Sequence, residues 1–399
     1  MKKICRKTKM LTKKLTLCCT TALLIGGIAA TSDAAGITVY KDGDKYVKMG
    51  GRIQLQYHYF NPDMGSSSDD LFFRRLRPYI EGSIHKNWKG KFQMDFGKAE
   101  GENEVAVKDA YMQYHGFNNM KLTLGNANFP FSRELLTSSK KQQLVERTFV
   151  GDHNYGTPDR NAGVHLTGYA MEGKKLTWGA SVSSAEIDPD NKKLDFDTPV
   201  NRNDDFNQGW MVGGRVDYHP FGMLKFEQGD FKREGKATIG VAAYHWANDD
   251  DNNTYTDDAG LCTGPGKCDV DKVTGFEIST AYRGYGISID AEYNILKPDL
   301  VDKSFTDGIY QNGETDLKNW AIEGGYMFSG NMFEIGAAYQ NQDADGYADK
   351  WTRTSFFGNW FITKNHDIKT QLTYRIGKNV DGVKDKDVDE IFLQAQYVF

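Results

Sequence analysis

Apolar and polar residues alternate along most of this chain in short runs. In the clearest run, residues 287–295, every second residue is apolar or aromatic, and Ser288, Asp290, Glu292 and Asn294 stand between them. Residues 333–339 and 368–376 follow the same pattern. Successive side chains of a strand point to opposite faces, so each run predicts a strand with one apolar and one polar face. The charges on the polar face predict that this face meets water.

Such runs recur throughout the chain after residue 34. A run of about ten residues is long enough for a tilted strand to cross a membrane. The last run, residues 391–399, is apolar on one face, carries Gln394 and Gln396 on the other, and ends on Phe399. Sixteen runs are present, centred near residues 53, 78, 94, 110, 123, 166, 179, 214, 242, 279, 290, 323, 335, 357, 372 and 394.

The connections between the runs alternate in length. Short connections, such as residues 115–119 and 284–285, alternate with long polar connections, such as residues 186–207 and 248–271. Short turns on one side and long loops on the other are typical of outer-membrane barrels. The pattern therefore predicts an all-β, 16-stranded antiparallel transmembrane β-barrel. The connection 219–234 is longer than a periplasmic turn should be, and no feature of the sequence accounts for it.

The N-terminus predicts a cleaved signal peptide over residues 1–34. Seven basic residues precede an apolar stretch of 16 residues, Leu15 to Ala30, which is too short and wrongly flanked for a spanning helix. Small residues around Ala34 mark the expected cleavage site. Residues 35–399 then form a single barrel, because no linker or shift in composition divides them, and we expect it in the bacterial outer membrane.

Composition and charge narrow the class of protein further. The mean hydropathy of −0.60 fits a membrane protein only if it is a barrel, in which lipid-facing and water-facing residues alternate. A soluble secreted β-sandwich has a similar composition and stays an alternative. The formal charge is −5, and it becomes about −11 once the net +6 of residues 1–34 is removed. This acidic balance argues against nucleic-acid binding.

The sequence contains no recognisable catalytic motif. It has no Gly-x-Ser-x-Gly, no His-Glu-x-x-His and no phosphate-binding glycine loop, so we expect neither an enzyme nor a cofactor or metal site. Cys262 and Cys268 flank a Gly-Pro-Gly turn, and in an exported chain they are expected to pair as a loop disulfide. An outer-membrane enzyme and a plugged structural or adhesive barrel are the alternatives to a channel.

Basic residues occur on the predicted lumenal face. In residues 72–81, alternation directs Arg75 and Arg77 toward the lumen, and an arginine facing lipid at mid-depth would cost about 2–4 kcal/mol. Guanidinium groups along a pore wall attract and guide anions. The alternative is that they pair with wall carboxylates such as Asp95 or Asp109 and only hold the wall in shape. Further inward candidates are Arg52, Lys121, Arg215, Arg283 and Arg375.

The connection 128–160 differs from the other long loops. Ser132 is placed to cap a short helix, and the basic residues of the connection include Arg133, Arg147 and Arg160. In a solvated loop the apolar residues of this connection would be exposed to water. We therefore expect the segment to fold into the barrel and narrow the pore, although the segment could also plug the pore. These apolar residues are Phe129, Phe131, Leu135, Leu136, Leu144, Val145 and Phe149.

Several segments resemble the phosphate-selective porin O/P family. They are residues 73–77 (Phe-Arg-Arg-Leu-Arg), 81–82, 88–96, 108–111, 129–139, 146–147 and 160–164, in family-like order. The resemblance implies a sixteen-stranded barrel, usually a homotrimer, whose third external loop folds into the lumen. It also implies lumenal arginines and lysines that guide phosphate or other anions. Arg75 and Arg77 match wall arginines of the family, and Arg133 and Arg147 lie in the constricting loop.

These observations predict an outer-membrane porin, a passive diffusion channel for small hydrophilic solutes and especially anions such as phosphate. The residues expected to guide anions are Arg75, Arg77, Lys121, Arg133, Arg147, Arg160 and Arg215. One departure concerns Asn128, where the family often has a lysine. With the acidic net charge, this departure makes a general, weakly selective porin the alternative. The expected partners are polar or anionic solutes, outer-membrane lipid and two further copies of the chain.

Overall fold

A computed structural model describes residues 36–97, 105–197, 207–249 and 253–399 of the chain. The predicted signal peptide, residues 1–34, lies outside the described residues. Within the described ranges, no helix is long and apolar enough to cross a membrane.

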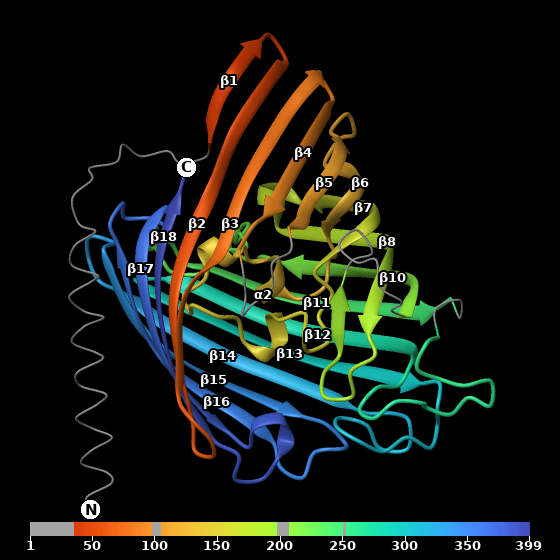
Figure 1. The fold of residues 1–399 in the computed structure, drawn as a ribbon. Helices are drawn as coiled ribbons and strands as arrows, with labels where there is room; N and C mark the ends of the chain where they lie inside the picture. Colours follow the sequence, from red (N-terminus) through yellow and green to blue (C-terminus); the bar gives the residue numbers. More distant parts are fainter. Residues whose placement is uncertain (1–35, 98–104, 198–206, 250–252) are drawn as a thin grey trace, which may run out of the picture.

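Sixteen antiparallel strands close into a barrel (Figure 1). Each pairs with its neighbours in the chain, β8 pairs directly with β10, and β18 pairs with β2 to close the ring. Each of the sixteen predicted centres falls within one of these strands, so the predicted fold class is confirmed. The strands are β2 (Lys45–Pro62), β3 (Ser68–His85), β4 (Trp88–Asp95), β5 (Ala106–Tyr114), β6 (Met120–Asn128), β7 (Arg160–Ala170), β8 (Leu176–Asp188), β10 (Asn207–Tyr218), β11 (Lys236–Asn248), β12 (Val270–Gly284), β13 (Ile287–Leu300), β14 (Leu317–Met327), β15 (Phe333–Asp343), β16 (Trp351–Phe361), β17 (Ile368–Lys378) and β18 (Val388–Val398).

Two further strands stand outside the ring. β1 (Ile37–Asp42) folds back on the start of β2, and β9 (Asp195–Asp197) pairs with the end of β8 in a long connection. Both are too short to give a clear alternating run, which is why the sequence pattern did not reveal them.

The alternation along each strand separates a lipid-facing side from an interior side. On β14, Trp320 and Ile322 point outward and are exposed, whereas Asn319 and Glu323 point inward and are buried. The same holds for β18, where Gln394 faces the interior. The outer face is therefore apolar and the inner face polar, as an outer-membrane barrel requires.

Both ends of the described chain lie at one end of the barrel (Figure 1). The backbone N–H of Gly51 donates to the carbonyl of Phe399 at 2.8 Å. This end also carries tight turns, such as the one at Tyr285 and Gly286, whose positive φ angles of 58° and 89° suit a two-residue hairpin. Short turns identify it as the periplasmic end.

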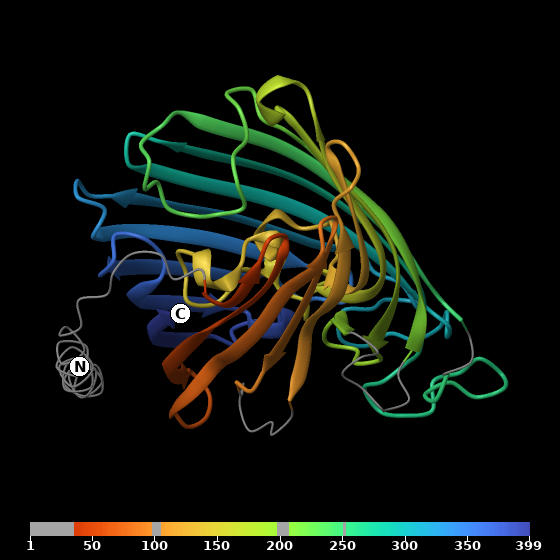
Figure 2. The ribbon, with the colours of Figure 1, turned by 90° about the horizontal axis from the view of Figure 1, so that it is seen from above.

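The connection between β6 and β7, residues 129–159, is called the L3 segment below. It lies inside the ring of strands (Figure 2, yellow) and contains the helix α2 (Arg133–Leu136) and the 3-10 turns η1 (Ser139–Lys141) and η2 (Phe149–Gly151). The side chain of Ser132 accepts a hydrogen bond from the Leu135 N–H at 3.1 Å, as the capping pattern predicted. Phe129 and Phe131 are fully buried against the inward-facing Tyr244.

A second connection also turns back into the barrel. Residues 219–235, called the T4 segment below, join β10 to β11 at the periplasmic end. The Gly229 N–H donates to the Ser288 hydroxyl of β13 at 3.1 Å, and the His366 ring donates to the Gln228 carbonyl at 2.9 Å. These contacts explain the length of the connection, because its residues pack inside the barrel and do not form a simple turn.

Candidate channel lining

Arg75 and Arg77 project from β3 into the barrel, as alternation predicted. Arg75 is 4% exposed, and its Nη1 donates to the Gln54 side chain at 3.2 Å. The Arg77 Nε lies 2.5 Å from a carboxylate oxygen of Asp95 on β4. Arg77 is therefore paired with a wall carboxylate, whereas among the described residues Arg75 is bonded only to a neutral amide.

A β-bulge adds a third arginine to this wall. Gln54 pairs with Arg75 and Leu55 pairs with Phe73, so Arg74 is the extra residue between them. Arg74 turns inward, and its Nε lies 2.7 Å from Glu146 in the L3 segment, while Phe73 is exposed on the outer face. Strict alternation assigned Arg74 to the lipid side, so the sequence analysis missed it.

Glu146 fastens the L3 segment to this wall. Both of its carboxylate oxygens accept from Arg74, at 2.7 and 3.2 Å, and one also accepts from Gln56 at 3.0 Å. Burial alone would raise the pKa of Glu146, but the positive charges of Arg74 and Arg75 outweigh it and lower the pKa to about 2. The carboxylate is therefore ionised at neutral pH.

The basic wall continues from β3 to β7. Arg160 donates to Asp109 at 2.7 Å and to Asp159 at 2.8 Å, and Lys91 lies 2.5 Å from Asp109. Alternating cations and carboxylates thus line this side of the interior. The positive charges of Arg77 and Arg160 are therefore balanced by ion pairs with these carboxylates.

Three arginines on this side form no such ion pair among the described residues. Within the described ranges, no carboxylate forms an ion pair with Arg52, Arg75 or Arg147, and the Nε of each is buried without a hydrogen-bond partner. Arg52 donates to the Ser138 hydroxyl at 3.1 Å, and Arg147 donates to the carbonyls of Leu135 and Thr137, both at 3.1 Å. Their positive charge is therefore not balanced by an ion pair among the described residues.

Lys121 lies near the periplasmic end of β6, and its side chain is exposed. It borders a cavity of about 630 Å³ that is also lined by Asn128, Thr167, Tyr169 and Phe226. The cavity lies between the wall strands β6 to β8 and the T4 segment. It continues the basic side of the interior toward the periplasm.

Arg133 and Arg215 occupy a different part of the interior from the other predicted arginines. Arg215 donates to both oxygens of Asp217, at 2.7 and 2.8 Å, to Glu277 at 2.9 Å and to the Phe131 carbonyl. Arg133 is 2% exposed and donates to Asp290 at 3.2 Å. Both therefore fasten the L3 segment to the wall between β10 and β13.

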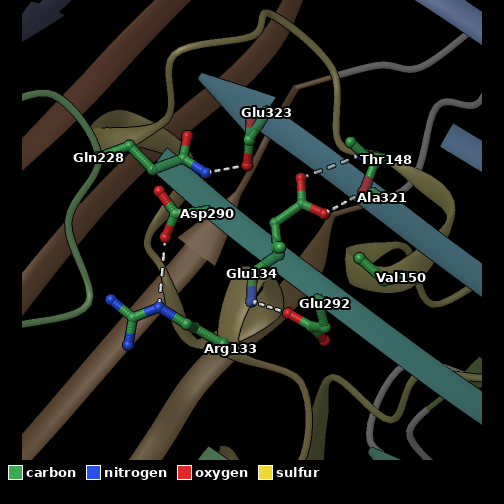
Figure 3. Close-up of a pocket in the computed structure, with 10 residues that line it drawn as sticks. Arg133, Glu134, Thr148, Val150, Gln228, Asp290, Glu292, Ala321 and Glu323 are labelled. Carbon is green, nitrogen blue, oxygen red and sulfur yellow. Dashed lines mark hydrogen bonds and ion pairs between the residues drawn. The ribbon is translucent and has the colours of Figure 1, made fainter. Parts of the chain in front are cut away.

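Carboxylates gather on the wall that faces the basic side. Glu134 of the L3 segment donates its N–H to Glu292 at 2.9 Å, and Gln143 donates to Glu334 at 2.7 Å (Figure 3 shows the first contact). Burial raises the pKa of Glu134, although two hydrogen bonds from Thr148 oppose the shift. We call the inward carboxylates of β12 to β15 the acidic wall: Glu277, Asp290, Glu292, Glu323 and Glu334. Their place on polar strand faces was visible in the sequence, but only the fold shows that they gather on one wall.

Among the described residues, the external loops hold one covalent cross-link. Cys262 and Cys268 form a disulfide between β11 and β12. Among the described residues, no group of three or more His, Cys, Asp or Glu side chains has the geometry to hold a metal ion.

A closed 16-strand barrel with an apolar outer face, a charged interior and segments folded into the bore is an outer-membrane channel. The model of the family described as phosphate-selective porin O and P matches residues 47–399, and the chain belongs to this family. It is 25% identical to Porin O of Pseudomonas aeruginosa over 92% of this chain and 94% of that protein.

Solved structures share the fold at lower sequence identity. A loop-deleted form of OmpT, an outer-membrane protein of Vibrio cholerae, is 14% identical with a TM-score of 0.58, and the match covers 89% of this chain and 100% of that one. An anion-selective porin from Comamonas acidovorans is 12% identical with a TM-score of 0.56, over 89% and 100% of the two chains.

Proposed function

We propose that this protein is a diffusion channel that favours small anions, such as phosphate, and that it catalyses no reaction. The observation that carries the proposal is the excess of positive charge on the β2 to β7 side. Arg52, Arg75 and Arg147 have no carboxylate partner among the described residues, and each keeps an unused Nε–H. An anion moving past them gains charge-assisted hydrogen bonds in place of part of its hydration shell.

The other predicted residues take different parts in this proposal. Arg77 and Arg160 belong to the same path, but their carboxylate partners reduce their net attraction. Lys121 lies at the periplasmic exit, beside the cavity of about 630 Å³. Arg133 and Arg215 act indirectly, by holding the L3 segment in the position where it narrows the bore. Asn128 borders the same cavity at the opposite end of β6 from Lys121, so this cavity lacks the second lysine that the family often has there.

The remaining expectations belong to the same proposal. Residues 1–34 direct export and are removed, residues 35–399 form the barrel, and residues 128–160 constrict it. Family membership supports assembly as a homotrimer in outer-membrane lipid. The solutes are small, because the L3 segment and the T4 segment both occupy part of the bore.

Ion selectivity in planar bilayers tests the proposal. The protein is expected to give single-channel steps and a reversal potential that indicates anion preference under a potassium chloride gradient. The double variant Arg52→Gln, Arg75→Gln should reduce this preference by removing the two unpaired charges. The matched control is Lys272→Gln, which removes one exposed external charge paired with Asp299 and should leave the reversal potential unchanged.

Three results would contradict the proposal. Cation preference in the unmodified protein would exclude an anion channel. An unchanged reversal potential in the double variant would remove Arg52 and Arg75 from the path. A complete lack of single-channel steps would favour a plugged structural barrel, in which the L3 segment closes the bore.

A further inference from the structure

The T4 segment meets the L3 segment inside the barrel, and Gln228 is the centre of the contact. The Gln228 N–H donates to the Lys141 carbonyl at 3.0 Å, and its side-chain oxygen accepts from the Gln143 N–H at 2.7 Å. Its side-chain nitrogen donates to Glu323 of the acidic wall (Figure 3). Gln228 is 1% exposed, so one neutral amide joins a periplasmic segment, an external segment and the wall.

Further contacts fasten the T4 segment on both sides of Gln228. A carboxylate oxygen of Asp230 accepts from the Gly286 N–H at 2.7 Å, and Arg233 donates to the Met327 carbonyl at 2.7 Å. Phe231 packs edge-on against Phe361 at 4.9 Å between ring centroids. These partners belong to the turns at the periplasmic ends of β12 to β17, so the segment is docked along that half of the barrel.

At their junction, the two segments leave little space beside the acidic wall. The cavity at their junction is lined by Arg133, Glu134, Gln228, Asp290, Glu292 and Glu323 and measures about 10 Å³. Such a space holds roughly one water molecule and admits no solute. On its other side, the T4 segment presents Met223 and Phe226 to the cavity of about 630 Å³ next to Lys121. The T4 segment thus lies between the small cavity at the acidic wall and the larger cavity on the basic side.

We infer that the T4 segment is a selectivity element that seals the acidic half of the bore and confines solutes to the basic half. The inference rests on the proposed function, because it explains how a barrel with five inward carboxylates on one wall still favours anions. Without the seal, Glu292, Glu323 and Glu334 would face water and attract cations. Gln228 is the positioning residue on which the seal depends.

Two variants test the seal in full-length protein. The first replaces residues 219–235 by Asn-Gly, which leaves a short hairpin loop between the paired residues Tyr218 and Ile239. The second is Gln228→Ala, which keeps the chain length and removes the bonds to Gln143 and Glu323. The matched control is Gln208→Ala on β10, because Gln208 bonds to the Ser184 hydroxyl at 3.2 Å on the outer face.

Single-channel conductance and reversal potential are measured for all three. The replacement should raise conductance roughly twofold or more and shift selectivity toward cations, because charge lining the water-filled bore sets which ions pass. Gln228→Ala should shift selectivity in the same direction with a smaller gain, and Gln208→Ala should match the unmodified protein. If the replacement variant does not insert into the bilayer, the shift in the reversal potential of Gln228→Ala decides alone whether the T4 segment seals the acidic half.

The outcomes separate this inference from the proposed function. Unchanged conductance and selectivity in Gln228→Ala and in an inserted replacement variant would overturn the seal and leave the anion channel standing. A cation-selective unmodified protein would overturn the proposed function. In that case, a further rise in conductance on replacement would still support the seal.

Discussion

The ion pair between Glu146 and Arg74 should decide whether the L3 segment stays docked on β3. The substitution Glu146→Gln keeps the shape of the side chain and removes its charge. The pKa of Glu146 is lowered from 4.5 to about 2, and each pKa unit corresponds to about 1.4 kcal/mol, so the docked state gains about 3 kcal/mol from this carboxylate. The glutamate side chain is 19% exposed, so solvent screens the pair only in part.

Hydrogen exchange of residues 139–150 measures the docking free energy. At neutral pH, Glu146→Gln should lower protection of these amides by roughly a hundredfold, since about 1.4 kcal/mol is tenfold in an opening equilibrium. In the unmodified protein the contribution is fully present above the undocked pKa, near 4.5, and is lost as the pH falls toward 2. The variant should lack this pH dependence.

Glu227→Gln is the matched control for this experiment. Glu227 also holds the L3 segment, through Lys141 at 2.9 Å, but the two side chains are 33% and 31% exposed. An exposed pair of this kind contributes about 0–1 kcal/mol. If Glu146→Gln loses no more protection than Glu227→Gln, the argument from burial and charge is wrong.

Two further predictions concern ion pairs elsewhere in the interior and the loops. Arg215→Met should destabilise the barrel by about 3–5 kcal/mol because it leaves buried carboxylates without their partner, and thermal unfolding in detergent should show it. A rise in the unfolding temperature would contradict this expectation. The His153 ring lies 2.8 Å from the Asp195 carboxylate. Burial lowers the pKa of His153, but the Asp195 carboxylate has a larger opposite effect and raises the pKa to about 9. The contact should therefore stabilise the loop fully below about pH 6.5 and weaken as the pH rises through about 9, and a His153 titration by NMR with a midpoint near 6.5 would refute it.

The barrel was predictable from the sequence because its determinants are local. Alternation depends only on neighbouring residues, and it gave the strands, their facing and the inward direction of Arg75 and Arg77. It failed at Arg74, because one inserted residue shifts the facing of everything before it, and no residue type in this stretch marks the bulge. Phe73 on the outer face is the visible consequence.

The interior contacts were less predictable, because they join residues that are distant in the chain. The apolar residues of residues 128–160 indicated a segment folded inward, but nothing in the T4 segment identifies Gln228 as the partner of Glu323. The same limit applies to Arg133 and Arg215. Their residue type suggested anion guidance, whereas their carboxylate partners, which only the fold reveals, assign them to holding the L3 segment.

The acidic net charge of the chain also has a structural explanation. Charge acts on a passing ion only over a distance comparable with the screening length, about 8 Å at physiological ionic strength. Asp257 and Asp258 are exposed on an external loop, and Glu292 and Glu323 are covered by the L3 and T4 segments. Under the proposed function, Arg52 and Arg75, which form no ion pair among the described residues, are the charges that a solute on the basic side meets at close range. Net charge of the whole chain is a poor guide to selectivity when one half of the bore is sealed, and the conductance of the T4 replacement variant measures how much that seal contributes.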